Sequence, residues 1–287
     1  MAPKTLFVIP GTWELTPGIT YNTPVGMLKG VTDRINRNIF DVVFVNYPAR
    51  FGPIAGNGEP PLSQLGSPSY AESVDMGVEE VVRLIKALPA GRKYGIIGYS
   101  QGGAIAAQVG RELLTDPTLA TRKADCYWLH TFGAPHRPIG KTFHNGNNWL
   151  LWGGISGDPI GGFQAPGLPS TLDWFDYCLP KDMFGDANPE SYCTAGYQAV
   201  ADMSLSDPIG WVQAIITSIT SGEIAEAAND LATNPTRFAN KLGNTIWCVQ
   251  QHIESNAHTR YGIDNIIPGW TAIAHSANHL NYWGARR

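Results

Sequence analysis

Charged side chains are scarce in this chain of 287 residues, because Asp, Glu, Lys and Arg together make up 15% of it. The formal net charge is −4, and no long block of lysine or arginine occurs. The sequence therefore offers no basic field that would attract a nucleic acid, and we expect no such partner. Hydrophobic residues make up 43% of the chain, which is typical of a globular protein with a substantial core.

Cysteines are few as well, and long hydrophobic runs are missing from the sequence. The four cysteines are scattered and form no Cys-x-x-Cys pattern, which argues against a disulfide framework and against a zinc site. Only a bridge between Cys178 and Cys193, which flank one loop, stays open. The most apolar late segment, 211–219, is interrupted by polar residues, so we expect no integral membrane segment. Residues 5–9 are too short for the hydrophobic part of a signal peptide, so we expect no Sec signal.

A Gly-x-Ser-x-Gly motif at 98–102 is the feature around which the rest of the chain can be arranged. In an α/β hydrolase the serine of this motif lies on a strained turn from strand to helix, and the two glycines let neighbouring segments approach. The apolar run that ends at Gly98 predicts a strand, and 104–114 has the apolar periodicity of a helix. Ser100 is therefore the candidate nucleophile, because its motif has the expected context on both sides.

An oxyanion hole for this nucleophile would need two backbone amides. The amide of the residue after the serine, Gln101, is one candidate, since it opens the predicted helix. The turn at Pro10–Glu14 follows the first predicted strand, and in hydrolases of this type such a loop donates the second amide. The sequence therefore predicts the amides of Thr12 and Gln101 as the two donors.

Strands alternate with helical segments over the first two thirds of the chain. This alternation predicts an α/β fold with a mostly parallel sheet and helices on both faces, and the active site of such a sheet lies at the carboxyl ends of its strands. Helical patterns are expected over 27–39, where the pattern is weak, and over 70–87. The predicted strands cover 5–9, 40–45, the apolar run from Tyr94 into the serine motif, 126–132 and 171–178.

The composition changes after residue 188, where helical patterns follow one another without a convincing strand. Helices are predicted over 211–219, 223–232 and 235–253. We therefore divide the chain into a core at 1–188, a helical insertion at 189–265, and a return to the core at 266–287. The insertion falls between the predicted acid and base; it either caps the pocket or only covers an edge of the sheet.

A catalytic acid is expected after a strand that follows the nucleophile, because the order of such triads is serine, acid, histidine. Asp182 lies in the turn after the strand at 171–178 and meets this condition best. Asp158 and Asp186 are the alternatives, whereas Asp173 and Asp176 lie inside the strand.

A catalytic base must come after the acid, which leaves four of the seven histidines. His252 and His258 lie on or at the end of a predicted helix of the insertion, and we interpret them as solvated side chains. His275 and His279 both belong to the final segment. Periodicity does not choose between these two.

Several motifs together resemble the LysB family, the mycolylarabinogalactan esterases of mycobacteriophages, which are related to cutinases. The resemblance covers most of the chain and is weakest in the helical insertion. Besides the serine motif, it rests on Gly11–Thr12, Asn46–Pro48, Phe132–Pro135, Asp182–Phe184 and His279–Tyr282.

The resemblance implies a cutinase-like α/β hydrolase in which Ser100 attacks, Asp182 is the acid and His279 the base, with the amides of Thr12 and Gln101 holding the oxyanion. It implies no metal and no cofactor. The substrate it implies is the ester between mycolic acids and arabinogalactan, cleaved during phage-induced lysis. The protein would then stay in the host cytoplasm until lysis and act at the cell envelope afterwards.

Two other functions remain open from the sequence. The first is a cutinase-like or PE-PPE-type lipase that acts on other acyl esters, since these proteins share the same serine motif. The second is an inactive hydrolase fold that only binds lipid or cell wall.

Overall fold

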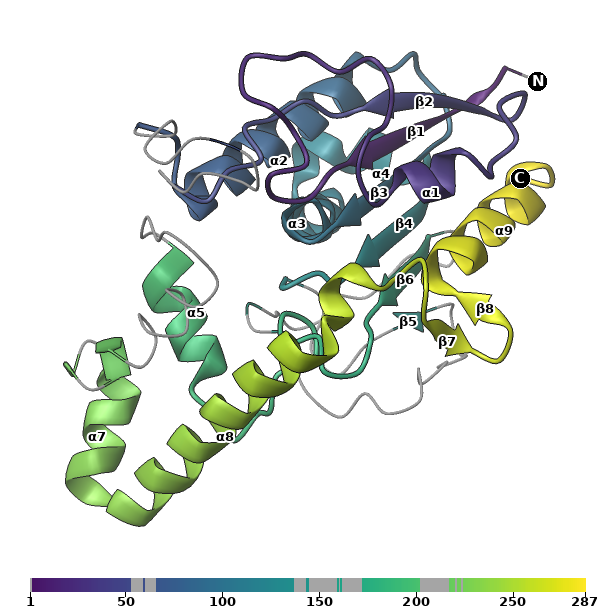
Figure 1. Cartoon of the computed structure of the whole chain (residues 1–287). Helices are drawn as coiled ribbons and strands as arrows, with labels where there is room; N and C mark the ends of the chain where they lie inside the picture. The colour runs from purple at the N-terminus through teal and green to yellow at the C-terminus, as the bar shows by residue number, and fades with distance from the viewer. Residues whose placement is uncertain are drawn as a thin grey trace.

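A computed structural model of the chain describes residues 2–52, 59, 66–136, 143–144, 159, 161, 172–201, 217–219, 221–222 and 224–287 (Figure 1). The β-strands are β1 (Lys4–Ile9), β2 (Phe40–Phe44), β3 (Tyr94–Tyr99), β4 (Cys126–Phe132), β5 (Phe143–His144), β6 (Asp173–Tyr177), β7 (Asn265–Ile267) and β8 (Trp270–Thr271). The α-helices are α1 (Lys29–Thr32), α2 (Tyr70–Ala87), α3 (Gln101–Thr115), α4 (Ala120–Lys123), α5 (Cys193–Ala201), α7 (Ala225–Thr233), α8 (Pro235–Ser255) and α9 (Ala272–Gly284). Short 3₁₀ turns follow α3 and α8, at Pro117–Leu119 (η1) and Ala257–Thr259 (η2).

The main sheet has the strand order β2-β1-β3-β4-β6-β5. Its first five strands run parallel, and β5 joins the edge antiparallel to β6. The chain leaves β1 toward β2 on one side and returns to β3 on the other, so the order reverses between β1 and β3. A crevice for a ligand is expected at the carboxyl ends of strands beside such a reversal. The predicted mostly parallel α/β fold is confirmed.

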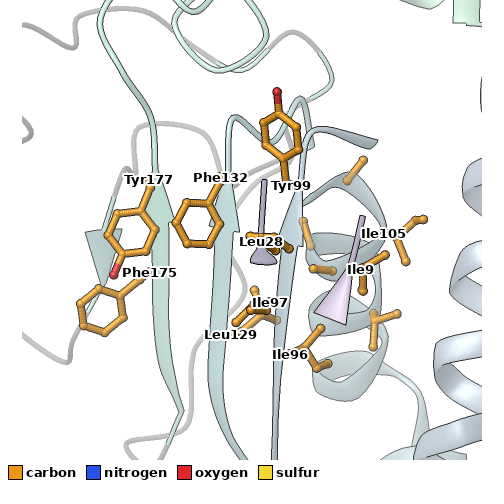
Figure 2. Close-up of a cluster of buried hydrophobic side chains, with 14 of the residues drawn as sticks. Ile9, Leu28, Ile96, Ile97, Tyr99, Ile105, Leu129, Phe132, Phe175 and Tyr177 are labelled. Carbon is orange, nitrogen blue, oxygen red and sulfur yellow. The ribbon is translucent and has the colours of Figure 1, made fainter. Parts of the chain in front are cut away.

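The central strands β1 and β3 are buried along their whole length. A strand of a parallel sheet that is covered on both faces needs apolar residues at consecutive positions, which is why residues 6–9 of β1 are all apolar and β3 contains no charged residue. Figure 2 shows Ile96 and Ile97 of β3 among the buried side chains of this core, with Ile9 of β1 nearby.

Helices cover both faces of the sheet, as predicted. Consecutive residues of β4 point to opposite faces: Leu129 lies against Gly110 of α3, whereas His130 Nδ1 lies 2.8 Å from Ser276 Oγ of α9. Helix α2 packs beside α3, and α1 packs beside α9 (Figure 1).

Helix α2 has the same bounds as the predicted helix because its sequence contains both end signals. Ser69 accepts a hydrogen bond from the Glu72 amide, and the Glu72 carboxylate accepts one from the Ser69 amide, which is a capping box. The helix ends at Leu88, directly before Pro89, where a proline disfavours further helical residues.

Helices α5, α7 and α8 lie to one side of the sheet, and the C-terminal end of α8 reaches it (Figure 1). Helices α7 and α8 match the predictions for 223–232 and 235–253 to within a few residues, whereas α5 and the β7–β8 hairpin were not predicted. The weak helical pattern over 27–39 produces only the short helix α1. The helix expected at 211–219 lies almost entirely outside the described residues. The division at residues 188 and 265 stays a prediction.

All four cysteines are buried free thiols, so the bridge left open between Cys178 and Cys193 is not formed. The Cys193 amide donates to Ser191 Oγ, and Cys248 Sγ of α8 accepts a hydrogen bond from the Asn188 amide. No described helix combines the length and the apolar character that crossing a membrane would require.

Candidate active site

Ser100 lies on the sharp turn between β3 and α3, with φ 53° and ψ −119°. A left-handed φ is unusual for a residue with a Cβ and marks a strained backbone of the kind that exposes a nucleophile. The turn also needs glycine on both sides. A Cβ at Gly102 would lie 2.2 Å from the Ile9 carbonyl oxygen, and one at Gly98 would lie 2.1 Å from the Gly102 carbonyl oxygen.

His258 is the histidine that lies beside this serine. Its Nε2 atom is 2.8 Å from Ser100 Oγ, and its Nδ1 atom is 2.8 Å from Asp182 Oδ2. Helix α8 ends at Asn256, which has the left-handed φ of 50°, and η2 then turns the chain back toward the serine. These contacts form one continuous chain of hydrogen bonds from the carboxylate to the serine hydroxyl.

The prediction of His279 as the base is wrong, and so is the interpretation of His258 as a solvated side chain. His279 lies on α9, where its ring packs against Phe175 of β6, and its Nε2 is 3.4 Å from Asp173 Oδ2. The reason is that α9 covers one face of the sheet, so its inward side chains enter the core rather than reach the carboxyl ends of the strands.

His275, which the sequence left open beside His279, does not reach the serine either. Its Nδ1 lies 2.9 Å from the hydroxyl of Tyr177, and its ring packs against Phe175.

Asp182 is fully buried in the turn that follows β6. Besides its contact with His258, it accepts hydrogen bonds from the Tyr261 hydroxyl at 2.5 Å and from the Phe184 amide at 3.2 Å. Burial by itself would raise the pKa of Asp182, but its interaction with His258, together with the Tyr261 hydrogen bond, holds it below its usual value. The carboxylate is therefore ionised at neutral pH and able to orient the imidazole.

The other carboxylates considered for the acid have other partners or lie outside the described residues. Asp173 pairs with Arg287 at 2.8 Å, and Asp176 accepts a hydrogen bond from Thr131. Asp186 accepts one from the Lys181 amide. Asp158 lies outside the described residues.

A second histidine, His252, lies close to the acid from the last turns of α8. Its Nδ1 accepts a hydrogen bond from the Met183 amide at 3.1 Å and is 3.8 Å from Asp182 Oδ1. Burial lowers the pKa of His252, more than the Asp182 charge raises it. The ring is therefore neutral at pH 7, and its Nδ1 is occupied by the Met183 amide.

Gly133, directly after β4, makes room for the acid and the base. Its φ is +57°, and a Cβ there would lie 2.7 Å from Asp182 Oδ2 and 2.9 Å from His258 Cε1. Glycine tolerates this conformation. Because it has no Cβ, it also leaves room for the side chains of Asp182 and His258.

The two predicted oxyanion donors, Thr12 and Gln101, flank Ser100. The turn that carries Thr12 packs against the serine, because a Cβ at Gly11 would lie 3.2 Å from Ser100 Cβ. Neither backbone amide donates to an acceptor within the described parts of the chain. The Gln101 side chain is tied away from the site, since its Nε2 donates to the Arg50 carbonyl oxygen at 2.8 Å.

The arrangement has the parts that acyl transfer requires, namely a nucleophile on a sharp turn, a base in contact with it, a buried acid and two amides that meet no acceptor within the described residues. Within the described residues, no group of three or more His, Cys, Asp or Glu side chains is arranged to hold a metal ion.

Comparisons with known proteins agree with this fold. Lysin B from Mycobacteriophage D29 superimposes with a TM-score of 0.56 at 18% identity, covering 99% of both chains. A cutinase-like protein from Cryptococcus sp. gives a TM-score of 0.44 at 16% identity, covering 64% of this chain and 79% of the other. At these identities the likeness to lysin B establishes the shared α/β-hydrolase fold.

The model of the PE-PPE domain matches residues 40–152, which is less than half of the chain. That range includes β3, the serine turn and α3, but ends before the acid and the base. No curated protein sequence matches the chain.

Proposed function

We propose that this protein is a serine ester hydrolase in which Ser100 is the nucleophile, His258 the general base and Asp182 the residue that orients the imidazole. The observation that carries the proposal is the pair of 2.8 Å contacts that joins the three side chains through the two nitrogens of His258. A serine hydroxyl is a weak nucleophile unless a base takes its proton, and the base needs a third group to hold its tautomer.

The reaction follows from this geometry. As Ser100 Oγ attacks the ester carbonyl carbon, its proton passes to His258 Nε2, and the amides of Thr12 and Gln101 hold the oxyanion that forms. His258 then gives the proton to the leaving alcohol, which leaves an acyl group on the serine. A water molecule, deprotonated by the same histidine, releases the acid. Asp182 stays ionised throughout and stabilises the imidazolium.

For the substrate, we propose the ester between mycolic acids and arabinogalactan, cleaved during phage-induced lysis. The support is the resemblance of the sequence motifs to the LysB family and the fold shared over 99% of both chains with lysin B from a mycobacteriophage. In this proposal the protein stays in the host cytoplasm until lysis and acts at the cell envelope afterwards. Separating cytoplasm from envelope before and after lysis, with immunodetection of the protein, tests this part.

The alternative is an esterase or lipase that acts on other acyl esters. The match of the PE-PPE domain model to 40–152 favours it, since the match includes the serine turn. The two functions share the triad and differ in the acyl group and the alcohol that they accept.

One experiment separates these functions. Wild type and Ser100→Ala are incubated with purified mycolylarabinogalactan and with p-nitrophenyl esters of increasing chain length, and released fatty acids are measured by mass spectrometry. Free mycolic acids with wild type alone would support the mycolyl ester as substrate. Hydrolysis of the small esters alone would favour the alternative. If wild type hydrolyses neither type of substrate, the result would favour an inactive hydrolase fold that only binds lipid or cell wall.

A further inference from the structure

The carboxylate of Glu14 closes the turn on which Thr12 lies. Its Oε2 accepts a hydrogen bond from the Gly11 amide at 2.7 Å, and the Glu14 amide donates to the Gly11 carbonyl oxygen at 3.3 Å. Its Oε1 accepts a hydrogen bond from the Met27 amide at 2.6 Å. Both carboxylate oxygens are therefore used, one to close the turn and the other to fix the turn to the segment that precedes α1.

The backbone of this turn is strained and is held at further points. Trp13 has φ 61°, and its amide donates to the carbonyl oxygen of Ala49 at 2.9 Å. Ala49 itself has φ 53°, and the Tyr47 hydroxyl donates to the Pro10 carbonyl oxygen at 2.7 Å. A conformation that costs free energy persists only where its surroundings impose it. The turn from Pro10 to Glu14 is thus held in one shape rather than left to relax.

Gly26 leaves room for the Glu14 carboxylate. Gly26 has φ +70°, and a Cβ there would lie 2.3 Å from both Cδ and Oε1 of Glu14. Burial raises the pKa of Glu14, while the hydrogen bonds from the Gly11 and Met27 amides act in the opposite direction.

We infer that Glu14 is a positioning residue for the oxyanion hole, which holds the turn so that the Thr12 amide stays directed at the carbonyl oxygen bound beside Ser100. This inference rests on the proposed ester hydrolysis. An oxyanion donor stabilises the transition state more than the bound ester, so a donor that moves lowers the rate of the chemical step. Glu14 acts through Thr12 and does not touch the substrate.

The test compares Glu14→Gln with wild type. A glutamine offers one oxygen where two amides need acceptors, so one end of the turn is released. We expect kcat for p-nitrophenyl butyrate to fall roughly 10- to 100-fold with KM nearly unchanged. Binding of butylboronic acid, which forms a tetrahedral adduct with the serine, should weaken by a similar factor. Glu79→Gln, which removes an exposed carboxylate on α2, is the matched control and should match wild type.

Glu14→Asp keeps the charge but is shorter by one methylene, so it cannot reach both amides, and it should show the same kcat loss. Unchanged kcat and unchanged boronate affinity in a folded Glu14→Gln would overturn the inference, as would a loss confined to KM. If neither variant folds, Glu14 serves stability and the inference fails. An inactive wild type would instead refute the proposed function.

Discussion

At the scale of single residues, the site depends on a carboxylate that is buried and yet ionised. Asp182 keeps its charge because His258 and Tyr261 both donate hydrogen bonds to Oδ2, and the Phe184 amide donates to Oδ1. Hydrogen bonds to the charged form of a carboxyl offset the cost of removing it from water. The same contacts fix which nitrogen of His258 carries the proton.

Asp182→Asn should therefore lower kcat by about 10⁴-fold, because an amide no longer holds His258 in the tautomer that accepts the serine proton at Nε2. The measurement is kcat for a p-nitrophenyl ester, with thermal unfolding to show that the variant folds. Asp186→Asn, in the same loop, is the control and should stay within a few-fold of wild type. A similar loss in both variants would point to disturbance of the loop instead.

Two residues of the triad could be predicted from the sequence, and the third could not. Ser100 and Asp182 could be placed because each follows a strand, and strands were recognised from local apolar runs. His258 was overlooked because a histidine at the end of a helix is usually solvated, and only the left-handed turn at Asn256 returns it to the sheet. Tyr261, three residues after His258, contacts the acid as well, which only the folded structure shows.

At the scale of elements, the glycine that ends β4 controls the distance between the acid and the base. Gly133→Ala should lower kcat by about 100-fold, because the new Cβ would lie within 3 Å of both Asp182 and His258 and push them apart. Gly243→Ala in α8 is the matched control, since a Cβ there meets nothing within 4 Å and an alanine favours the helix.

Activity and thermal unfolding of the two alanine variants check this prediction. Full activity of Gly133→Ala would show that a Cβ at this position does not displace Asp182 or His258. Lower activity in Gly243→Ala would show that glycine replacement by itself disturbs the enzyme.

The helices and strands predicted best are those whose pattern and ends can be recognised in their own sequence. The helix at 70–87 was predicted from its apolar periodicity and from Pro89, and β4 from an apolar run, so both were predicted without any knowledge of the fold. Helix α5 and the β7–β8 hairpin were missed, because α5 has a weak apolar pattern and the two strands of the hairpin are only three and two residues long. Elements of that kind depend on contacts with distant parts of the chain.

At the scale of the whole molecule, histidines in and beside the sheet contact the helices around it. His130 contacts Ser276, and His136 lies between Gln108 of α3 and Tyr197 of α5 at 2.8 and 2.7 Å. Burial lowers the pKa of His136 and of His275 to about 4, and it also lowers that of His130 well below its usual value. All three rings are therefore neutral in the folded protein at neutral pH.

The free energy of unfolding should consequently fall as the pH drops from 6.5 toward 4. In this window the unfolded chain binds protons at these histidines, with a pKa near 6.5, and the folded protein does not, so acid favours the unfolded state. Urea unfolding at several pH values measures how steeply the free energy of unfolding changes with pH. In His136→Gln this slope should decrease by the equivalent of nearly one bound proton. A stability that stays constant from pH 7 to 4.5 would contradict this account.

The central claim is that His258, rather than His279, is the base for Ser100. The most direct measurement is kcat/KM for a p-nitrophenyl ester, together with the rate at which a fluorophosphonate labels Ser100, in wild type, His258→Ala and His279→Ala. A general base contributes about 10²- to 10⁴-fold, so His258→Ala should lose at least that factor in both assays. His279→Ala should keep its activity and unfold at a lower temperature, because it leaves a cavity between α9 and the sheet. Loss of labelling in His279→Ala, with His258→Ala still active, would contradict the account.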